Sequence, residues 1–272
     1  MERNLITKLK KDGLVVVENF FSIDECKRYK EKIIQILEKK IIKNQYVGNN
    51  TYQVIENYFT FDDSFFRIIY SELIDQIMME LIDQDYVILS SSARNAHLNK
   101  KIKLNSKTSG IGWHTDTRYI QEQRIKPSLI YTSIVPLEDF TLSNGTTKFI
   151  LGSHKFKGKP EREKDYKNAN NLIAKKGSLI VIDTALWHRA GMSTNKSRWA
   201  IFTMYAPWFI KPYFQFDKMI PKNKVKELHP KIRQLLHFDS IPPKVHDSSN
   251  LATLKRVRKE LKKAHLLSKI NE

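Results

Sequence analysis

The sequence predicts a mainly β fold, an antiparallel barrel or sandwich with helices packed on its outside. Short apolar and β-branched segments recur between residues 86 and 210, as in 129–135 and 178–183. Turn signals separate them, most clearly Asn144-Gly145 and Lys176-Gly177. Two segments with helical spacing of apolar residues come before this region, and a stretch interrupted by prolines follows it.

The chain of 272 residues shows no repeat and no linker-like change of composition, so we expect a single domain over residues 1–272. Within it we expect a helical N-terminal part, a β core at about 86–210 and a helical C-terminal extension at about 217–272. With 41% hydrophobic and 11% aromatic residues, the chain can bury a sizeable core.

The N-terminal part should open with a strand over residues 13–21, which are apolar and β-branched. Ser22 and Glu25 have the spacing of a capping box and predict a helix that follows. Cys26 lies on the apolar face of that helix, so we expect a core thiol rather than a nucleophile. Residues 62–83 predict a second helix, whereas residues 44–57 look polar and irregular.

The chain is strongly basic, with 47 Lys and Arg against 29 Asp and Glu and a formal net charge of +18. Such a charge is compatible with nucleic acid or an anionic membrane as a partner. The basic residues are scattered along the chain, so we favour solvated surfaces and expect no nucleic-acid partner. The local exception is residues 251–270, a basic amphipathic helix that we expect to pack its apolar stripe on the domain.

Targeting signals are lacking in the sequence given. No apolar run approaches the ~20 residues that a membrane span needs, and residues 1–11 lack the apolar core of a signal peptide. A single cysteine excludes an internal disulfide and suits a reducing compartment. We therefore expect a cytoplasmic protein, and its oligomeric state stays open.

The chemistry centres on Trp113-His114-Thr115-Asp116 and on His188, much farther along the chain. Side chains two residues apart on a strand point to the same face, so His114 and Asp116 can address one point. His188, arriving from a distant strand, would complete a two-His, one-carboxylate set with three positions left open. Non-haem Fe(II) oxygenases use this ligand set. A His-x-Asp triplet alone is weak evidence, and the distant histidine with its following arginine strengthens it.

That arginine is Arg198, at the start of a predicted return strand over residues 199–206. A dicarboxylate such as 2-oxoglutarate chelates iron through its keto-acid end and leaves its far carboxylate to be neutralised. A guanidinium offers that carboxylate a bidentate fork. Arg198 alone would indicate a surface salt bridge, but together with His188 it predicts a cosubstrate site.

These residues resemble the phytanoyl-CoA dioxygenase (PhyH) family of Fe(II)/2-oxoglutarate oxygenases, which includes ectoine hydroxylase. Beyond the metal motif and the pair His188 and Arg198, four further segments carry the resemblance. They are Lys11-Asp12-Gly13-Leu14-Val15-Val16-Val17, Pro136-Leu137-Glu138-Asp139, Asn144-Gly145 and Gly152-Ser153-His154-Lys155. Leu151 departs from the family, which commonly has proline before that glycine.

The resemblance implies a double-stranded β-helix (jelly-roll) core. It implies iron held by His114, Asp116 and His188, and the far carboxylate of 2-oxoglutarate held by Arg198. The polar stretch 100–110, directly before the metal motif, is expected to form a lid-like loop.

Three further roles follow from the resemblance. A hydroxyl on the strand after the metal motif assists cosubstrate binding, and Thr132 is the best placed. An amide on the strand before the motif touches the cosubstrate, and Asn95 is the candidate. His154 is expected to give structural support rather than to act as a fourth ligand.

The implied reaction consumes Fe(II)-bound 2-oxoglutarate and O2, hydroxylates an unactivated C–H bond of a small-molecule metabolite or biosynthetic intermediate, and releases succinate and CO2. Asp116 favours hydroxylation, desaturation or epimerisation over halogenation, because related halogenases replace this carboxylate with a small residue. Basic side chains near the expected mouth permit an anionic substrate. They are Lys100, Lys101, Lys103, Lys107, Arg118 and Arg124.

Three other classes of protein compete with this interpretation. A non-catalytic member of the family could serve as a binding module, but all four site residues are present. A cupin-like metal isomerase would share the barrel and two histidines, yet it has no need of Arg198. A nucleic-acid- or anion-binding jelly-roll protein would explain the charge of +18, and the tail at 251–270 is its best support.

Overall fold

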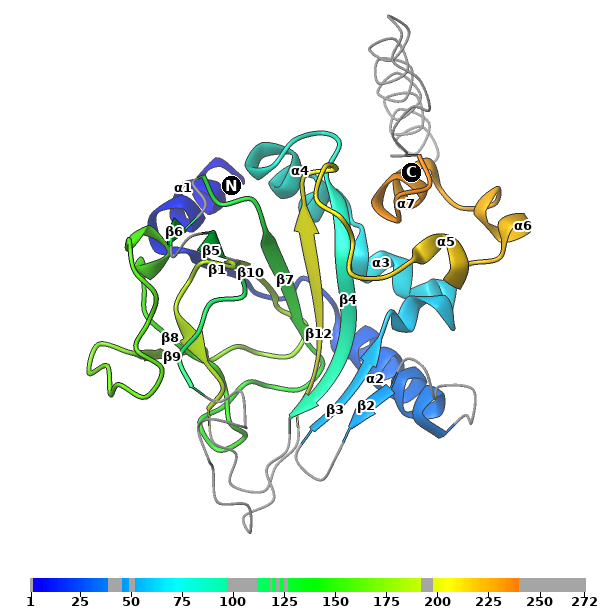
Figure 1. Ribbon diagram of the computed structural model, residues 1–272. Coiled ribbons are helices and arrows are strands. Elements are labelled where there is room, and N and C mark those ends of the chain that lie inside the picture. The colour runs from blue at the N-terminus through cyan, green and yellow to red at the C-terminus, as the bar shows by residue number, and fades with distance from the viewer. Residues whose placement is uncertain are drawn as a thin grey trace, which may run out of the picture.

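The computed structural model describes residues 2–38, 46–48, 52–96, 112–117, 119–120, 123–124, 127–191 and 198–239. Within these residues a large antiparallel sheet packs against a small one, and helices cover the other face of the large sheet (Figure 1). This arrangement confirms the predicted mainly β fold with flanking helices. The single-domain organisation over residues 1–272 stays a prediction.

The large sheet has seven strands in the order β1-β10-β7-β12-β4-β3-β2, and the small sheet has the order β11-β8-β9. The strands β5 and β6 form a separate two-stranded sheet within the described residues. The bounds are β1 Leu14–Val17, β2 Tyr46–Gly48, β3 Tyr52–Glu56, β4 Val87–Ala96, β5 Tyr119–Ile120, β6 Gln123–Arg124, β7 Tyr131–Pro136, β8 Lys148–Phe149, β9 Asn170–Asn171, β10 Leu179–Asp183, β11 His188–Arg189 and β12 Arg198–Ala206.

Seven α-helices are described, with three short 3-10 turns between them. The helices are α1 Glu2–Asp12, α2 Ile23–Glu38, α3 Phe66–Ile69, α4 Glu72–Leu81, α5 Phe216–Met219, α6 Lys222–Val225 and α7 Pro230–Leu235. The 3-10 turns are Tyr58–Thr60, Asp63–Phe65 and Ser153–Lys155. None of the described helices is long and apolar enough to cross a bilayer.

Three elements differ from the expectations. The strand expected over residues 13–21 covers only Leu14–Val17, and it follows α1, whose Leu9 is buried. The segment expected to be irregular contains β2 and β3, which extend the large sheet beyond β4. The second predicted helix is interrupted, because Ser71 accepts a hydrogen bond from the backbone N–H of Ile74 and starts α4 afresh. The expected loop at 100–110 and the basic helix at 251–270 lie outside the described residues.

The two faces of the large sheet bury different sets of side chains, following the period of two along each strand. One face packs under the helices and includes Val135, Val181 and Ile201; we call it the helix face. The opposite face packs against the small sheet, and we call it the inner face. Its buried cluster is Leu14, Ile134, Phe140, Phe149, Leu172, Ala174, Ile180, Ile182, Leu186 and Ala200.

The start of α2 follows the predicted capping box. The backbone N–H of Ser22 donates to the Glu25 carboxylate (2.8 Å), and that of Glu25 donates to the Ser22 hydroxyl (3.2 Å). Cys26, in α2, is fully buried in the cluster between the helices and the helix face. Burial raises the pKa of its thiol to about 11. The predicted core role of Cys26 is confirmed, since a thiol with such a pKa is a poor nucleophile at neutral pH.

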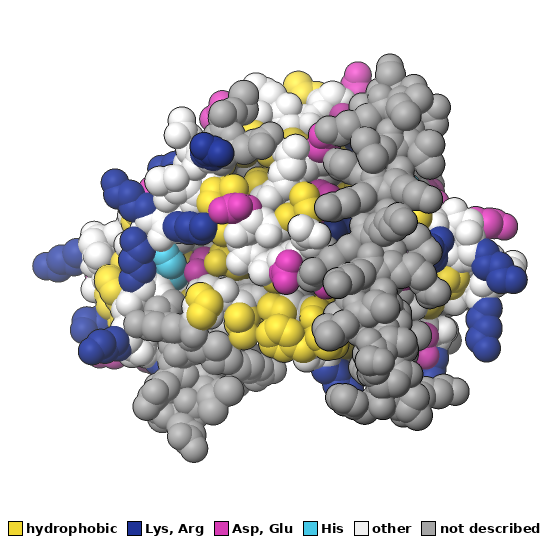
Figure 2. Space-filling view, turned by 90° about the horizontal axis from the view of Figure 1, so that it is seen from above, with side chains coloured by type: hydrophobic (Ala, Val, Ile, Leu, Met, Phe, Trp, Pro, Cys, Tyr) yellow, Lys and Arg dark blue, Asp and Glu magenta, His cyan; other side chains and the backbone are white. Residues whose placement is uncertain are grey.

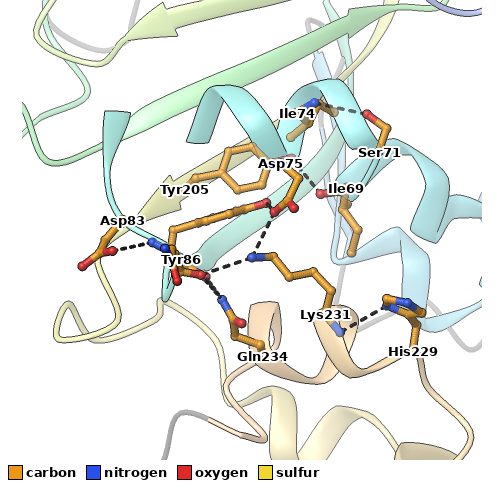
Figure 3. A network of polar contacts seen from close by, with 11 residues as sticks. Ile69, Ser71, Ile74, Asp75, Asp83, Tyr86, Tyr205, His229, Lys231 and Gln234 are labelled. Atoms are coloured by element: carbon orange, nitrogen blue, oxygen red, sulfur yellow. Dashed lines mark hydrogen bonds and ion pairs between the residues drawn. The ribbon is translucent and has the colours of Figure 1, made fainter. Parts of the chain in front are cut away.

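A buried polar network fixes α7 to the sheet and to α4 (Figure 3). The Lys231 ammonium lies 3.0 Å from the Asp75 carboxylate and 4.2 Å from the centre of the Tyr86 ring. Tyr86 donates its hydroxyl hydrogen to the same carboxylate (2.8 Å), and Gln234 donates to the Tyr86 carbonyl. The described C-terminal helices are thus attached by paired charges as well as by apolar packing.

Candidate metal centre

Three side chains with metal-binding atoms converge where the metal motif meets the small sheet. The Nε2 atom of His114 lies 3.8 Å from one Asp116 carboxylate oxygen, and Nε2 of His188 lies 3.6 Å from the other. The ligand atoms of the three residues all lie within 4.8 Å of one another. In the described part of the chain, this is the group that could hold a metal ion. Two imidazole nitrogens and one carboxylate match the predicted donor set.

The main chain brings these residues together. His114 and His188 form an isolated antiparallel bridge, in which each backbone N–H donates to the carbonyl of the other (2.9 and 3.0 Å). The backbone N–H of Asp116 donates to the carbonyl of Thr184, directly after β10 (2.9 Å). The metal motif is thus less regular than the predicted strand, but the two distant segments meet as expected.

Both imidazoles are oriented by hydrogen bonds from Nδ1, the ring nitrogen that does not face Asp116. Nδ1 of His114 donates to the carbonyl of Gly112 (2.8 Å), and Nδ1 of His188 donates to that of Leu186 (2.9 Å). Each Nε2 therefore carries the lone pair, which is the tautomer a metal needs. Burial, together with the nearby His188, lowers the pKa of His114, and this favours the neutral ring.

An aromatic group supports the two histidine segments from behind. The Tyr166 ring lies edge-on to Trp113, with centroids 5.2 Å apart, and to Trp187, with centroids 5.7 Å apart. Each tryptophan directly precedes one of the histidines. Tyr166 was not predicted as a site residue, because it lies in a charged surface stretch. Its one distinguishing feature in the sequence is that it is an aromatic residue among charged neighbours.

Arg198 is buried, with 5% of its surface exposed, at the start of β12. Its guanidinium donates to the carbonyls of Asn144 (3.2 Å) and Gly145 (2.8 Å) and lies 4.4 Å from the centre of the Phe140 ring. No carboxylate pairs with it among the described residues, and burial lowers its pKa to about 10. A buried cation that lacks an anion fits a carboxylate-bearing cosubstrate.

The turn that holds Arg198 also lies close to the end of the His188 segment. A Cβ atom added to Gly191 would overlap the carbonyl oxygen of Thr146 and crowd Gly145. Gly145 itself has φ of 73°, which suits glycine in the predicted Asn144-Gly145 turn. The close approach of these backbones brings Arg198 to the same end of the inner face as the histidine segment.

Thr132 and Asn95 lie on different faces of the large sheet. Thr132 is buried on the inner face of β7, two residues before Ile134, and its hydroxyl has no hydrogen-bond partner among the described residues. Asn95 lies opposite Trp199 in the β4–β12 register and donates to Gln53 (2.9 Å). Trp199 belongs to the helix-face cluster, so Asn95 points away from the inner face.

The placement of Asn95 does not support its expected contact with the cosubstrate. The expectation depended on the strand position alone, whereas the face depends on pairing register. His154 is buried beside α1 and donates from Nε2 to the Lys10 carbonyl (3.1 Å). It lies outside the group of three, which agrees with a supporting role.

An uncharacterised protein of Mycobacterium tuberculosis is 33% identical over 105 residues, which are 38% of this chain and 38% of that protein. Dioxygenase af480 of Aspergillus fumigatus is 30% identical over 111 residues, which are 39% of this chain and 35% of that protein. The alignments thus span well under half the length of these relatives.

Among solved structures, HygX from Streptomyces hygroscopicus, crystallised with nickel, 2-oxoglutarate and hygromycin B, has a TM-score of 0.59 and 13% identity. The alignment covers 77% of this chain and 88% of HygX. The epimerase SnoN, in complex with Fe3+, α-ketoglutarate and a nogalamycin, has a TM-score of 0.57 and 14% identity over 78% of this chain and 86% of SnoN. At such identities these structures establish the fold, and they confirm the jelly-roll core.

The family assignment comes from the sequence itself. Residues 9–200 match the phytanoyl-CoA dioxygenase (PhyH) family, whose enzymes use Fe(II), 2-oxoglutarate and O2. The matched range contains the metal motif, His188 and Arg198. Since it covers well over half of the 272 residues, the chain belongs to the phytanoyl-CoA dioxygenase family.

Proposed function

We propose that the protein is an Fe(II)- and 2-oxoglutarate-dependent dioxygenase that hydroxylates a C–H bond of a small molecule. The observation that carries this proposal is the buried Arg198, which has no carboxylate partner among the described residues and is held by a turn packed against the end of the His188 segment. A metal site alone would suit several classes of protein. A buried guanidinium at the same end of the inner face calls for an anionic cosubstrate.

The residues have separate tasks in this proposal. His114, Asp116 and His188 hold the iron, and the Nδ1 hydrogen bonds keep both imidazoles in the metal-binding tautomer. When bound, iron with 2-oxoglutarate and O2 supplies the oxidation, and the cosubstrate leaves as succinate and CO2. Arg198 neutralises the far carboxylate of 2-oxoglutarate.

Thr132 and the apolar inner face complete the cosubstrate site. Thr132 lies opposite Met204, six residues along β12 from Arg198, so its hydroxyl would donate to the iron-bound end of the cosubstrate and not to the carboxylate at Arg198. That hydrogen bond would satisfy a buried polar group that has no protein partner among the described residues. Ile134 and Ile182, buried on the same face, exclude water from this end of the site. Exclusion of water strengthens the contact between Arg198 and the carboxylate.

The Asp116 carboxylate in the third ligand position argues against halogenation, and among the remaining outcomes we propose hydroxylation. HygX and SnoN bind hygromycin B and a nogalamycin, so related folds accept small molecules. We propose a small-molecule substrate here as well. A cytoplasmic location, expected from the single cysteine, also stays a prediction.

Among the described residues, a nucleic-acid-binding function receives no specific support, and the stretch 251–270 lies outside them. Figure 2 shows the described Lys and Arg side chains of one face in separate groups, with hydrophobic and acidic side chains between them. A net charge of +18 permits nucleic-acid binding, but such binding typically uses a continuous basic stripe.

The test is optical and independent of turnover. Mixing the protein anaerobically with Fe(II) and 2-oxoglutarate should produce a weak visible charge-transfer band that needs both components. In Arg198→Met, Fe(II) affinity should persist, while the Kd for 2-oxoglutarate should rise about 10- to 100-fold, the effect of a lost charge-assisted contact. A folded wild-type protein that shows no band would overturn the proposal.

A further inference from the structure

The inner face continues across β12 onto β4, where it carries a second arginine. In the β4–β12 register Arg94 lies opposite Ala200, which is part of the inner cluster. Directly opposed residues of antiparallel strands share a face, so Arg94 is on the inner face. Arg198 lies opposite Ala96 in the same register, two residues along on both strands. The two arginines are therefore diagonal neighbours.

Unlike Arg198, Arg94 is exposed to solvent, yet its side chain is held in one orientation. The neighbouring Ala93 and Asn95 are buried. Its Nε donates to the Ser92 hydroxyl (2.8 Å), and its guanidinium carbon lies 4.9 Å from the centre of the half-buried Phe202 ring. These two contacts fix the side chain and leave the terminal nitrogens without an acceptor among the described residues.

One carboxylate lies near Arg94 on the same face. Glu56 is opposite Ser92 in the β3–β4 register, and it is half-buried. Burial raises the pKa of Glu56, and the charge of Arg94 opposes that rise. No described carboxylate is within ion-pair distance of Arg94, so Glu56 acts on it at longer range, where it would weaken the binding of an added anion.

We propose that Arg94 binds an oxyanion of the substrate, a carboxylate or a phosphate, while Phe202 contacts the adjoining apolar part. The inference rests on the proposed function, because Arg198 must be taken by 2-oxoglutarate for Arg94 to serve the substrate. A guanidinium whose Nε is already bonded can still present its two terminal nitrogens as a fork. Phe202 beside it offers an apolar contact surface.

Arginine footprinting on the wild-type protein tests the proposal without turnover. The protein, loaded anaerobically with Fe(II) and 2-oxoglutarate, is treated with phenylglyoxal, and the adduct on each arginine is measured by peptide mass spectrometry. Benzoate or phenyl phosphate should remove most of the Arg94 adduct, and benzyl alcohol should remove none. Arg28, which is exposed on α2, should react equally throughout.

The two acids distinguish a carboxylate site from a phosphate site. Protection of Arg198 by Fe(II) with 2-oxoglutarate, read in the same spectra, tests the proposed function separately. If Arg198 is protected but neither acid protects Arg94, the inference about Arg94 fails and the oxygenase proposal stands. If 2-oxoglutarate protects Arg94 instead of Arg198, both fail.

Variants give a second test, in which the direction of the change in affinity is predicted. The acid that protects Arg94 better is titrated by calorimetry into the protein with Fe(II) and 2-oxoglutarate bound, and its Kd is measured. Arg94→Met should raise its Kd about 10- to 100-fold, and Arg94→Lys should raise it less. Glu56→Gln should lower the Kd, since it removes the competing charge, and Arg28→Met should leave it unchanged. Equal affinity in the wild type and in folded Arg94→Met would overturn the inference, and the footprint does not depend on whether any variant folds.

Discussion

His114 and His188 exchange both backbone hydrogen bonds, at 2.9 and 3.0 Å, although they come from separate parts of the chain. The main chain therefore holds these two residues opposite each other. Asp116 is tied in the same manner, through its N–H to the carbonyl of Thr184. Replacing one ligand side chain should thus leave the other two in position.

Asp116→Ala tests this separation of fold from metal binding. Its side chain is 39% exposed and makes no backbone contact that the fold requires, so stability should change little. Fe(II) binding and succinate formation should both be lost, because two imidazoles alone hold the ion weakly. Metal content after gel filtration and thermal unfolding are the measurements.

Thr115→Ala is the matched control for that change, one residue away on the same segment. Its hydroxyl donates to the carbonyl of Thr117 at 3.4 Å and takes no part in the metal group. Iron content should stay at the wild-type value. Succinate formation that survives Asp116→Ala would show that the ligand assignment is wrong.

Tyr166→Leu should loosen the metal site without unfolding the domain. Tyr166 contacts both Trp113 and Trp187, so its loss lets the two histidine segments shift relative to each other. We expect weaker Fe(II) binding by about tenfold, which is the usual scale for support residues behind metal ligands. Competition with a chelator measures the affinity.

Two further variants separate aromatic packing from other effects of that change. Tyr166→Phe keeps the ring contacts and should keep the affinity. Phe156→Leu removes a ring that, of the two tryptophans, contacts Trp187 (5.2 Å), so its effect should be smaller. Equal Fe(II) affinity in Tyr166→Leu and the wild type would show that the tryptophan pair does not need this support.

Gly191→Ala should impair cosubstrate binding more than metal binding. The added methyl group would push against the carbonyl of Thr146 and the backbone of Gly145. Gly145 is a hydrogen-bond acceptor of Arg198, so the guanidinium should shift from its position. We expect a higher Kd for 2-oxoglutarate with an unchanged Kd for Fe(II). The reverse order of effects would contradict the placement of this turn beside the cosubstrate.

Much of the fold and of the metal site was predictable because the signals are local. Strand segments such as 129–135 and 178–183 are identified by their β-branched composition. The capping box at Ser22 is identified from the residues of the box itself. The pairing of His114 with His188 is not a local signal. It was predicted from the chemistry of the ligand set.

The rest depends on pairing register, which a single sequence does not contain. Asn95 and Arg94 are neighbours on β4, and the register decides which of them reaches the inner face. Asn95 was the predicted residue, but β4 pairs so that Arg94 lies on the inner face instead. Strand β3 was not predicted because its polar neighbours resemble a loop, and its pairing with β4 on one side and β2 on the other makes it a strand.

Lys231→Met should destabilise the protein, because it strips a buried charge of its partner. Lys231 and Asp75 are each 7% exposed, and methionine fills the lysine volume without its ammonium. The buried Asp75 carboxylate would keep only the Tyr86 hydroxyl, so we expect a loss of about 3–5 kcal/mol in the free energy of unfolding, measured in urea. Adding Asp75→Asn removes the stranded charge, so the double variant should be more stable than Lys231→Met alone. If the double variant is the less stable, packing of the lysine stem rather than pairing of charges holds α7 in place.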